Sequence, residues 1–302
     1  MTAPDFPIRR RLERLLGAEA LAYLLHLRPM EWPIMSAHFL LGTLLAVGWE
    51  TFRSIGPWTT LGWFIFVVLL NGGTLAINSA FDQDEGDIGY LKQPPKPPQH
   101  LFGVSLGMLT LSLGLGFLLP PAFAWSNAAC VALSVLYSVP PVRLKARAGW
   151  DLLVNCVGFG TLTPLAGWGL TGQALPSWFV LTTVGFGLLF GALYPTTQIY
   201  QIQEDRARGD RTLVIRLGEA RSLDAALLFT ALAHGAFAAA ALLRGLPWLW
   251  MLPSFLVWSA VLLPWRLHWE AWSQRCHRAG MYWALAAWAV TDLSLLLLLW
   301  PR

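Results

Sequence analysis

The sequence has little charge and few cysteines. Only 13% of its 302 residues are charged, whereas a soluble domain has about 25% charged residues. Its three cysteines lie in or beside apolar segments without paired or metal-ligand spacing: Cys130, Cys156 and Cys276. This pattern excludes a disulfide framework and a zinc site, and it predicts buried packing for the cysteines. The sequence also lacks a low-complexity segment, a separate soluble domain and an evident cleavable signal peptide.

Long apolar runs account for most of the chain. Apolar residues make up 56% of it, and 17 residues are Trp, a residue that is enriched where membrane helices meet the headgroups. We therefore predict an all-α polytopic membrane protein with one transmembrane domain over residues 1–302. Runs of membrane-spanning length, about 20 residues, predict nine transmembrane helices near 33–49, 58–82, 99–118, 122–138, 151–171, 177–200, 222–243, 247–265 and 279–299. We expect a cytoplasmic tail with an interfacial helix in residues 1–28, and an amphipathic surface helix at 266–278.

The positive charges predict the orientation of these helices. If nine spans are placed in this way, 18 of the 21 Lys and Arg residues fall on one side of the membrane. Loops rich in Lys and Arg face the cytoplasm. We therefore expect an integral protein of a bacterial or archaeal cytoplasmic membrane, with a cytoplasmic N-terminus, an external C-terminus and an active site that faces the cytoplasm.

An acidic stretch closes the second predicted span. Four of the 17 Asp and Glu residues gather there: Asp82, Asp84, Glu85 and Asp87. Like charges this close are costly unless cations neutralise them, and oxygen-only clusters suit Mg²⁺, which usually also binds a substrate phosphate. Asn78 shares a helix face with Asp82 because the two are four residues apart. The proline-rich loop that follows carries Lys92 and Lys96, so we expect a stiff, basic segment of diphosphate-binding composition.

A second polar stretch closes the sixth predicted span. Its polar positions follow the spacing of one helix face: Tyr194, Gln198, Gln201 and Asp205. A polar face inside a bilayer points at the bundle interior or at a wet cavity. Arg206 and Asp210 follow on the same side of the membrane as the first acidic stretch. We therefore expect the two stretches to hold one metal–diphosphate group between them.

These stretches resemble the UbiA superfamily of intramembrane prenyltransferases. The resemblance covers nearly the whole chain and is carried by Asn78, Asp82, Asp84 and Asp87, by Glu204-Asp205-Arg-Ala-Arg-Gly-Asp210-Arg-Thr-Leu, by Tyr137-Ser-Val-Pro-Pro-Val-Arg143-Leu-Lys145, and by Arg28-Pro29. Such a family implies nine helices around a central cavity with cytoplasmic cap loops. It also implies Mg²⁺-dependent ionisation of a polyprenyl diphosphate and alkylation of a lipophilic acceptor.

The resemblance leads to a set of expected roles. The expected catalytic residues are Asp82, Asp205, Lys145 and Tyr194. The expected Mg²⁺ ligands are Asn78, Asp82, Asp84, Asp87, Asp205 and Asp210. The expected diphosphate-binding residues are Arg28, Lys92, Lys96, Arg143, Arg206, Gln198 and Gln201. Aromatic residues are expected to line a dry cavity, because they stabilise a carbocation that water would quench.

The chain also departs from the family pattern. Asp87 lies nine positions after Asn78, where the family places its last Asp at eight. The family's second motif has Asp at the positions of Gln198 and Gln201, which are neutral here. A Gln carbonyl can bind a metal but adds no negative charge, so Asp205 is expected to contribute more to the site.

Other functions fit parts of the pattern. A membrane terpene cyclase of the same fold would need the same diphosphate machinery, so the motifs do not separate it from a transferase. A transporter would place its acids near the midplane, whereas here they gather at one face. Asp292, in the last span, lies about 20 Å from the cytoplasmic end by helical rise and is left outside the site. A non-catalytic scaffold is a further alternative, and a nucleic-acid partner is not expected.

Overall fold

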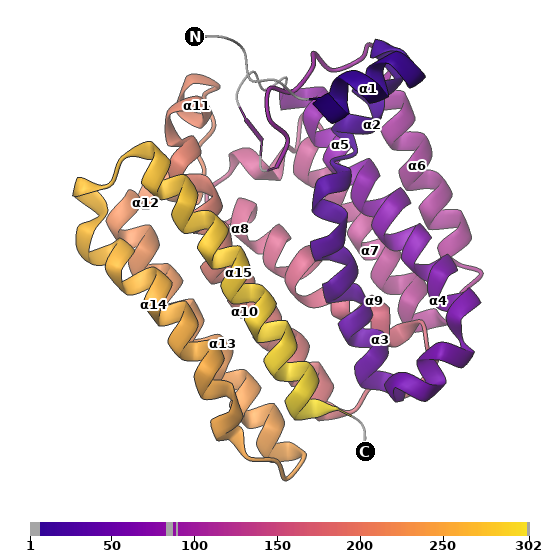
Figure 1. The fold of residues 1–302 in the computed structure, drawn as a ribbon, viewed down its shortest axis with the longest axis vertical. Coiled ribbons are helices and arrows are strands. Elements are labelled where there is room, and N and C mark those ends of the chain that lie inside the picture. The colour runs from indigo at the N-terminus through magenta and orange to yellow at the C-terminus, as the bar shows by residue number, and fades with distance from the viewer. Residues whose placement is uncertain (1–6, 83–86, 89, 301–302) are drawn as a thin grey trace.

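The chain folds into a bundle of long helices (Figure 1). The structure is a computed structural model, and it describes residues 7–82, 87–88 and 90–300. Every regular element within these ranges is helical, and the only bridge pairings are isolated ones. Helix α1 lies at one end of the bundle and the C-terminal end of α15 lies at the other.

The N-terminal half supplies the elements from α1 to α9. Their bounds are α1 Pro7–Leu16, α2 Ala18–His26, η1 Pro29–Glu31, α3 Trp32–Ser54, α4 Gly56–Trp63, η2 Phe64–Asn71, α5 Gly72–Asp82, α6 Leu101–Gly116, α7 Pro121–Ser138, η3 Leu144–Ala146, α8 Trp150–Asn155, η4 Cys156–Leu162 and α9 Thr163–Gly169.

The C-terminal half supplies the elements from α10 to α15. Their bounds are α10 Ser177–Gln198, η5 Ile199–Gln201, α11 Ile202–Ala207, α12 Leu213–Leu217, α13 Glu219–Leu243, η6 Trp248–Met251, α14 Leu252–His268, η7 Trp269–Ala271 and α15 Gln274–Leu299.

Each of the nine predicted spans overlaps helical residues of the structure. Seven helical stretches of the described chain are long and apolar enough to cross a membrane. Helix α6, with 16 residues, is apolar but shorter, and α7 is not among the seven. The membrane-embedded, all-helical fold is therefore confirmed, while the count of nine spans stays a prediction.

Two segments of the described chain have π-helical geometry. Residues 64–71 (η2) and 156–162 (η4) are π-helical, with η2 continuing into α5 and η4 joining α8 to α9. A π-helical turn accommodates an extra residue and redirects the side chains around it, and such turns are frequent at functional sites. Both segments contribute residues to the cavity described below.

The predicted surface helix at 266–278 is wrong. The segment is divided between the last turn of α14, the short turn η7 and the start of α15. Ser273 is the N-cap of α15, because its Oγ accepts a hydrogen bond from the Cys276 amide at 3.3 Å. Trp272 meanwhile stacks on Trp265, with ring centroids 5.3 Å apart. The Ser273 cap and the contact of Trp272 with the buried Trp265 thus divide the segment that was predicted to be one surface helix.

The apolar core forms two main clusters. One joins α10, α13, α14 and α15, with Trp258, Phe186 and Phe237 fully buried. The other joins α3, η2, α6, α7 and α9, and includes Phe66 and Phe123. The cavity is lined by elements of both clusters, so packing leaves an internal space between two well-filled groups of helices.

Candidate active site

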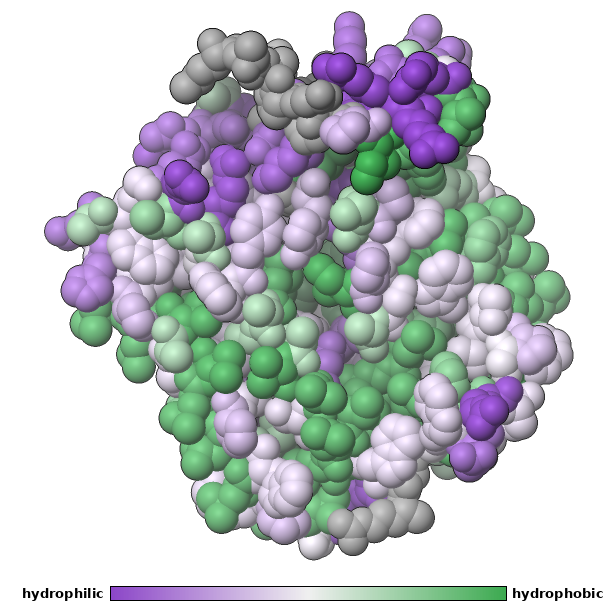
Figure 2. Space-filling view, viewed as in Figure 1, coloured by the Kyte–Doolittle hydropathy of each residue, from purple (hydrophilic) through white to green (hydrophobic). Residues whose placement is uncertain are grey.

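A cavity of about 340 Å³ lies between the two groups of helices. Figure 2 shows this face hollowed between them, with hydrophilic residues gathered at the end that carries α1 and α11. Its polar lining includes Arg28, Asn78, Asp82, Lys145, Tyr194, Gln198, Gln201, Asp205, Arg208 and Asp210. Its apolar lining includes Phe66, Leu70, Phe159, Phe190, Leu285 and Trp288. The cavity therefore has a charged mouth and an apolar interior.

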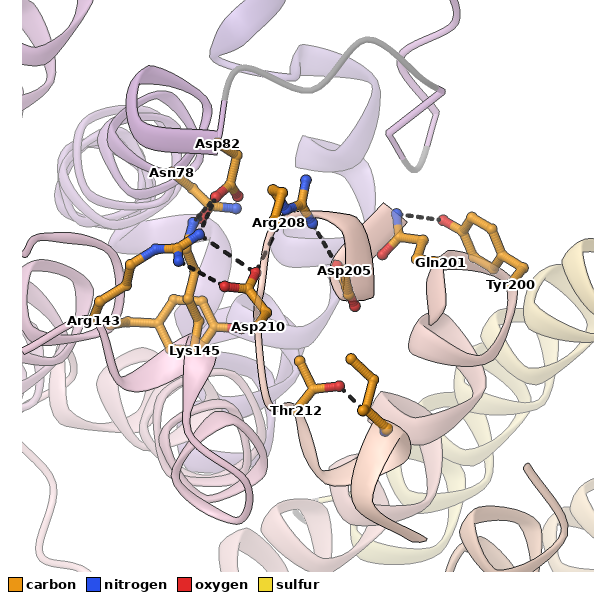
Figure 3. A network of polar contacts seen from close by, with 12 residues as sticks. Asn78, Asp82, Arg143, Lys145, Tyr200, Gln201, Asp205, Arg208, Asp210 and Thr212 are labelled. Atoms are coloured by element: carbon orange, nitrogen blue, oxygen red, sulfur yellow. Dashed lines mark hydrogen bonds and ion pairs between the residues drawn. The ribbon is translucent and has the colours of Figure 1, made fainter. Parts of the chain in front are cut away.

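The first acidic motif meets a lysine at this mouth. The Lys145 ammonium donates to both the Asn78 side-chain oxygen and the Asp82 carboxylate (Figure 3). Lys145 is only 7% exposed, so the contact forms in a medium where charges interact strongly. Asn78 and Asp82 lie one turn apart on α5, which presents both oxygens to the same cation.

Arg143 links the two acidic motifs. Its guanidinium donates to Asp210 at 2.6 and 3.4 Å and to Asp82 at 3.2 Å. The backbone of Arg143 is left-handed, with φ 35°, a conformation that is costly for a non-glycine residue and is often found at functional sites. One planar guanidinium thus bridges carboxylates that are 128 residues apart in the chain.

The second acidic motif contains its own cation. Arg208 donates to the Asp205 carboxylate, and its Nε lies 3.5 Å from Asp210 Oδ2. Asp205 is 4% exposed, and its second oxygen, Oδ2, is buried with no hydrogen-bond partner in the part of the chain that the structure describes. Figure 3 shows Asp205, Arg208 and Asp210 facing the Asn78, Asp82 and Lys145 group. Asp205 therefore retains an uncommitted oxygen.

The four residues of the predicted polar face line the cavity together, although the helix that carries them is interrupted. Helix α10 ends at Gln198, a 3-10 turn follows, and α11 begins at Ile202. Tyr194, Gln198, Gln201 and Asp205 nevertheless all line the cavity. The Tyr194 hydroxyl lies 3.2 Å from the Tyr137 hydroxyl of α7.

Asp151 fixes the segment that follows the second motif. Its carboxylate accepts hydrogen bonds from the Leu213 and Gly149 amides, both at 2.7 Å. The Arg211 amide donates to the Ala146 carbonyl at 3.0 Å. These bonds tie the chain after Asp210 to the loop that carries Arg143 and Lys145.

Arg28 reaches the cavity from the segment just before the first predicted span. It is 8% exposed, has a left-handed backbone with φ 49°, and lies 3.9 Å from Glu31. Its Nε and Nη2 atoms are buried and have no hydrogen-bond partner among the described residues. Uncommitted guanidinium donors beside the acidic motifs are suited to an anion.

Other predicted residues lie away from the carboxylate cluster. Asp87 accepts from Arg278 at 3.0 Å and from the Gln93 amide at 3.1 Å, and lies 3.3 Å from Lys92. Burial alone would raise the pKa of the Asp87 carboxyl, but the Gln93 amide and the neighbouring cations outweigh it and lower the pKa. Lys96 and Arg206 are exposed and are not part of the described cavity lining. Asp84 lies outside the described residues.

Sequence reasoning missed several cavity residues. Arg208 follows Asp205 by three residues and could have been found from that spacing. His38 Nδ1 lies 3.2 Å from Asp292 Oδ1 and its Nε2 lies 3.3 Å from the Gly160 carbonyl. This pairing joins α3 to α15 across 254 positions, and no local pattern predicts it.

The donor chemistry of the mouth suits a hard divalent cation. Asn78, Asp82, Asp205 and Asp210 offer only oxygen, and the buried Asp205 Oδ2 has no partner. In the described part of the chain, no three His, Cys, Asp or Glu side chains form a ready metal cluster. Lys145, Arg143 and Arg208 contact the three carboxylates instead. The residues fit Mg²⁺ by ligand type, with Asp205 Oδ2 the most available oxygen.

This chain is similar in sequence to proteins of one known family. The model of the UbiA prenyltransferase family matches residues 39–286. The Escherichia coli 1,4-dihydroxy-2-naphthoate octaprenyltransferase is 28% identical over 236 residues, which covers 70% of this chain and 74% of that protein. The Cereibacter sphaeroides bacteriochlorophyll synthase 33 kDa chain is 27% identical over 64% of this chain and 65% of its own. The Halobacterium salinarum lycopene elongase/hydratase is 28% identical over 65% and 71%.

Solved structures share the fold. A UbiA homologue from Archaeoglobus fulgidus bound to GPP and Mg²⁺ superposes with a TM-score of 0.66 at 18% identity, covering 89% of this chain and 99% of that one. A digeranylgeranylglyceryl phosphate synthase structure superposes with a TM-score of 0.65 at 16% identity, covering 91% and 96%.

Proposed function

This chain belongs to the UbiA prenyltransferase family, and we propose that it transfers an isoprenyl group from a polyprenyl diphosphate to a lipophilic acceptor within the membrane, with Mg²⁺ as cofactor. The observation that carries the proposal is a single cavity with a charged mouth and an apolar interior. The two acidic motifs and their cations meet at the mouth. Such a cavity suits a substrate with a charged head and a hydrocarbon tail.

The mouth is proposed to bind the diphosphate. Arg28 contributes the uncommitted donors Nε and Nη2, which suit a phosphate oxygen. Lys145 and Arg143 hold Asp82 and Asp210 in place and add positive charge beside the leaving group. Positive groups already fixed in this way stabilise the developing negative charge without further reorganisation.

Mg²⁺ is proposed to be held by Asp82, Asp205, Asn78 and Asp210, the oxygen donors of the mouth. When bound, it supplies Lewis-acid stabilisation of the diphosphate leaving group. The chain's own contribution is to keep these oxygens close together: Arg143 bridges Asp82 and Asp210, and Arg208 contacts Asp205.

The interior is proposed to shelter the allylic cation. Phe66, Phe159, Phe190 and Trp288 line it, and aromatic faces stabilise a positive charge. The apolar side chains that make up most of this lining also limit the access of water, which would otherwise capture the cation. Ionisation breaks the carbon–oxygen bond of the donor and releases diphosphate. The allylic cation then forms a bond to a nucleophilic atom of the acceptor, which loses a proton.

The experiment that tests this function measures diphosphate release. The purified protein in lipid receives farnesyl or geranylgeranyl diphosphate plus a membrane lipid extract, with and without Mg²⁺. We expect release to require Mg²⁺ and to fall at least about 100-fold in Asp82→Asn, because Asp82 is a proposed ligand of the Mg²⁺ that stabilises the leaving diphosphate. Asp224→Asn is the matched control, since Asp224 is exposed and pairs with Arg266 at 2.6 Å on the surface.

The outcomes separate the alternatives. Release that depends on the lipid extract supports a transferase. Conversion of the donor alone into a cyclic hydrocarbon supports a terpene cyclase. If folded protein shows no release with either donor, the proposal of diphosphate chemistry fails.

A further inference from the structure

The interior of the cavity contains a buried amide without a partner. Asn71 lines the cavity and is 3% exposed. Neither its Oδ1 nor its Nδ2 has a hydrogen-bond partner within the described chain. Buried polar groups in native proteins are nearly always hydrogen-bonded, because an unpaired one is costly. Asn71 therefore calls for a partner that the chain does not supply.

The backbone aims this amide inward. Asn71 is the last residue of the π-helical segment η2, and π-helical turns are frequent at functional sites. The second π-helical segment, η4, lines the same cavity through Gly158 and Phe159. Asn71 precedes Asn78 by seven residues, so it lies about 10 Å deeper than the charged mouth by helical rise.

The other polar groups of the interior are already committed. The Thr74 and Ser134 hydroxyls lie 2.6 Å apart, and each also contacts a carbonyl of its own helix at 2.8 Å. His38 is held by Asp292 and by the Gly160 carbonyl. Asn71 thus offers a donor and an acceptor in a region where its polar neighbours are satisfied.

We propose that Asn71 binds a hydroxyl group of the acceptor. The inference rests on the proposed function and names the acceptor class for it. An isoprenyl tail is pure hydrocarbon and cannot satisfy an amide, and the diphosphate binds about 10 Å away at the mouth. A hydroxyl both donates and accepts, so it can bond Oδ1 and Nδ2 together. A site built to bond a hydroxyl strongly disfavours an analogue without one, which excludes a purely hydrocarbon acceptor.

The first test is the stability of Asn71→Leu in lipid without added substrate. Leu has a similar volume and no polar group, so removing the unpaired amide should raise Tm. Ile77→Val is the matched control, because Ile77 is fully buried on the same helix in the core and is not part of the cavity lining. It should lower Tm. If Asn71→Leu lowers Tm instead, the chain or a structural water satisfies the amide, and the proposal is overturned.

The second test uses two probes, 1,4-dihydroxy-2-naphthoate and lycopene. The hydroxylated probe should raise the Tm of the wild type, and its Kd should weaken about tenfold or more in Asn71→Leu, as the loss of well-placed hydrogen bonds requires. Ile77→Val should retain this binding. Stronger binding of lycopene, equal binding of the hydroxylated probe to wild type and Asn71→Leu, or binding of neither probe would each overturn the proposal.

Failure of the inference can be separated from failure of the proposed function. Mg²⁺-dependent diphosphate release by the wild type reports on the proposed function alone. Release without Asn71-dependent binding of the hydroxylated probe rejects only the acceptor class. Asn71-dependent binding without release under any donor rejects the prenyl transfer while leaving a hydroxyl-binding site.

Discussion

Lys145 is buried among the residues that the two motifs contribute. It is 7% exposed and contacts both Asn78 and Asp82. Its carboxylate partner has one further cation, Arg143, at 3.2 Å. A buried charge that loses its partner is strongly destabilising, so experiments must separate a structural role of Lys145 from its proposed catalytic role.

Lys145→Met should lower kcat/KM for the donor at least about 100-fold, since it removes a fixed positive group beside the leaving diphosphate. It should also lower stability by about 3–5 kcal/mol, because Asp82 loses a buried partner. Steady-state kinetics and thermal melts measure the two effects. The double variant Lys145→Met/Asp82→Asn should recover stability, because it removes the unpaired carboxylate. An unchanged kcat/KM in Lys145→Met alone would assign Lys145 a structural role only.

Substitution of Arg28 tests whether the cavity mouth needs a planar guanidinium or only a positive charge. Arg28→Lys keeps the charge but loses the planar fork whose Nε and Nη2 are uncommitted. We expect the donor KM to rise about tenfold, the cost of one well-aligned charged hydrogen bond, as measured with geranylgeranyl diphosphate. An unchanged KM would mean that Arg28 acts as a point charge.

Local spacing predicted many of the site residues. Asn78 with Asp82, and Tyr194 with Gln198, Gln201 and Asp205, share helix faces, and the cavity lining includes them all. Asn71 was not predicted, although it precedes Thr74 by three residues and Asn78 by seven, a spacing that places all three on one helix face. Nor was the pairing of His38 with Asp292, because it depends on two helices from opposite ends of the chain.

At the scale of elements, helices α3 and α9 cross at very close range. A Cβ atom placed on Gly42 would lie 2.0 Å from the Pro164 carbonyl oxygen, and one on Gly167 would lie 1.9 Å from the Phe39 carbonyl oxygen. Small residues allow membrane helices to approach in this way. The crossing positions α3, which carries Ile34, Met35 and His38 of the cavity lining.

Gly42→Ala should therefore lower Tm, with a loss of about 2–3 kcal/mol in the free energy of unfolding, because the backbones must separate. Gly103→Ala is the matched control, since nothing lies within 4 Å of a Cβ there and alanine favours a helix by about 0.5–1 kcal/mol. Thermal melts of both variants in the same lipid measure the difference. Equal melting temperatures would contradict the close crossing.

The loop after α5 is anchored by Asp87. Its carboxylate joins the Gln93 amide, Lys92 and Arg278 of α15, and Ile88 and Tyr90 of the same loop line the cavity. Since the folded-state pKa of Asp87 is lowered, its contribution is present above the unfolded pKa of about 3.9. It is lost as pH falls through the still lower folded pKa.

Hydrogen exchange of the Gln93 amide should reflect this anchor. After correction for intrinsic rates, protection should be constant between about pH 5 and 8 and should decrease below about pH 4. Asp87→Asn should speed exchange by up to about fivefold throughout, as expected for a partly exposed ion pair worth about 1 kcal/mol or less. Protection that falls near pH 6 would point to a different anchor.

The charged residues are distributed unevenly over the whole molecule. The acidic motifs, the cations that contact them and the cavity mouth lie at one end of the bundle (Figure 2). The Gln274 side chain also donates to the Tyr200 carbonyl there, at 3.2 Å. Because loops rich in Lys and Arg face the cytoplasm, this end is expected to face the cytoplasm.

Cys276 provides a test of orientation. It is exposed, whereas Cys130 is buried and Cys156 is half-buried. A membrane-impermeant maleimide should label Cys276 in inside-out vesicles and not in right-side-out ones. Cys276→Ser combined with Ser54→Cys should reverse the pattern, because Ser54 is exposed at the end of α3, on the side that is predicted to be external. Labelling of Cys276 from outside would invert the proposed topology.

The sequence by itself determined that this chain is helical, membrane-embedded and built around two acidic motifs. Hydropathy and helical period are local properties, and a bilayer enforces them strongly because unpaired backbone groups cannot face lipid. Only the tertiary structure decided which cation contacts which carboxylate, that Arg143 bridges Asp82 to Asp210, and that Asn71 is left without a partner. Those outcomes depend on how distant helices pack and turn, and no local pattern encodes that packing.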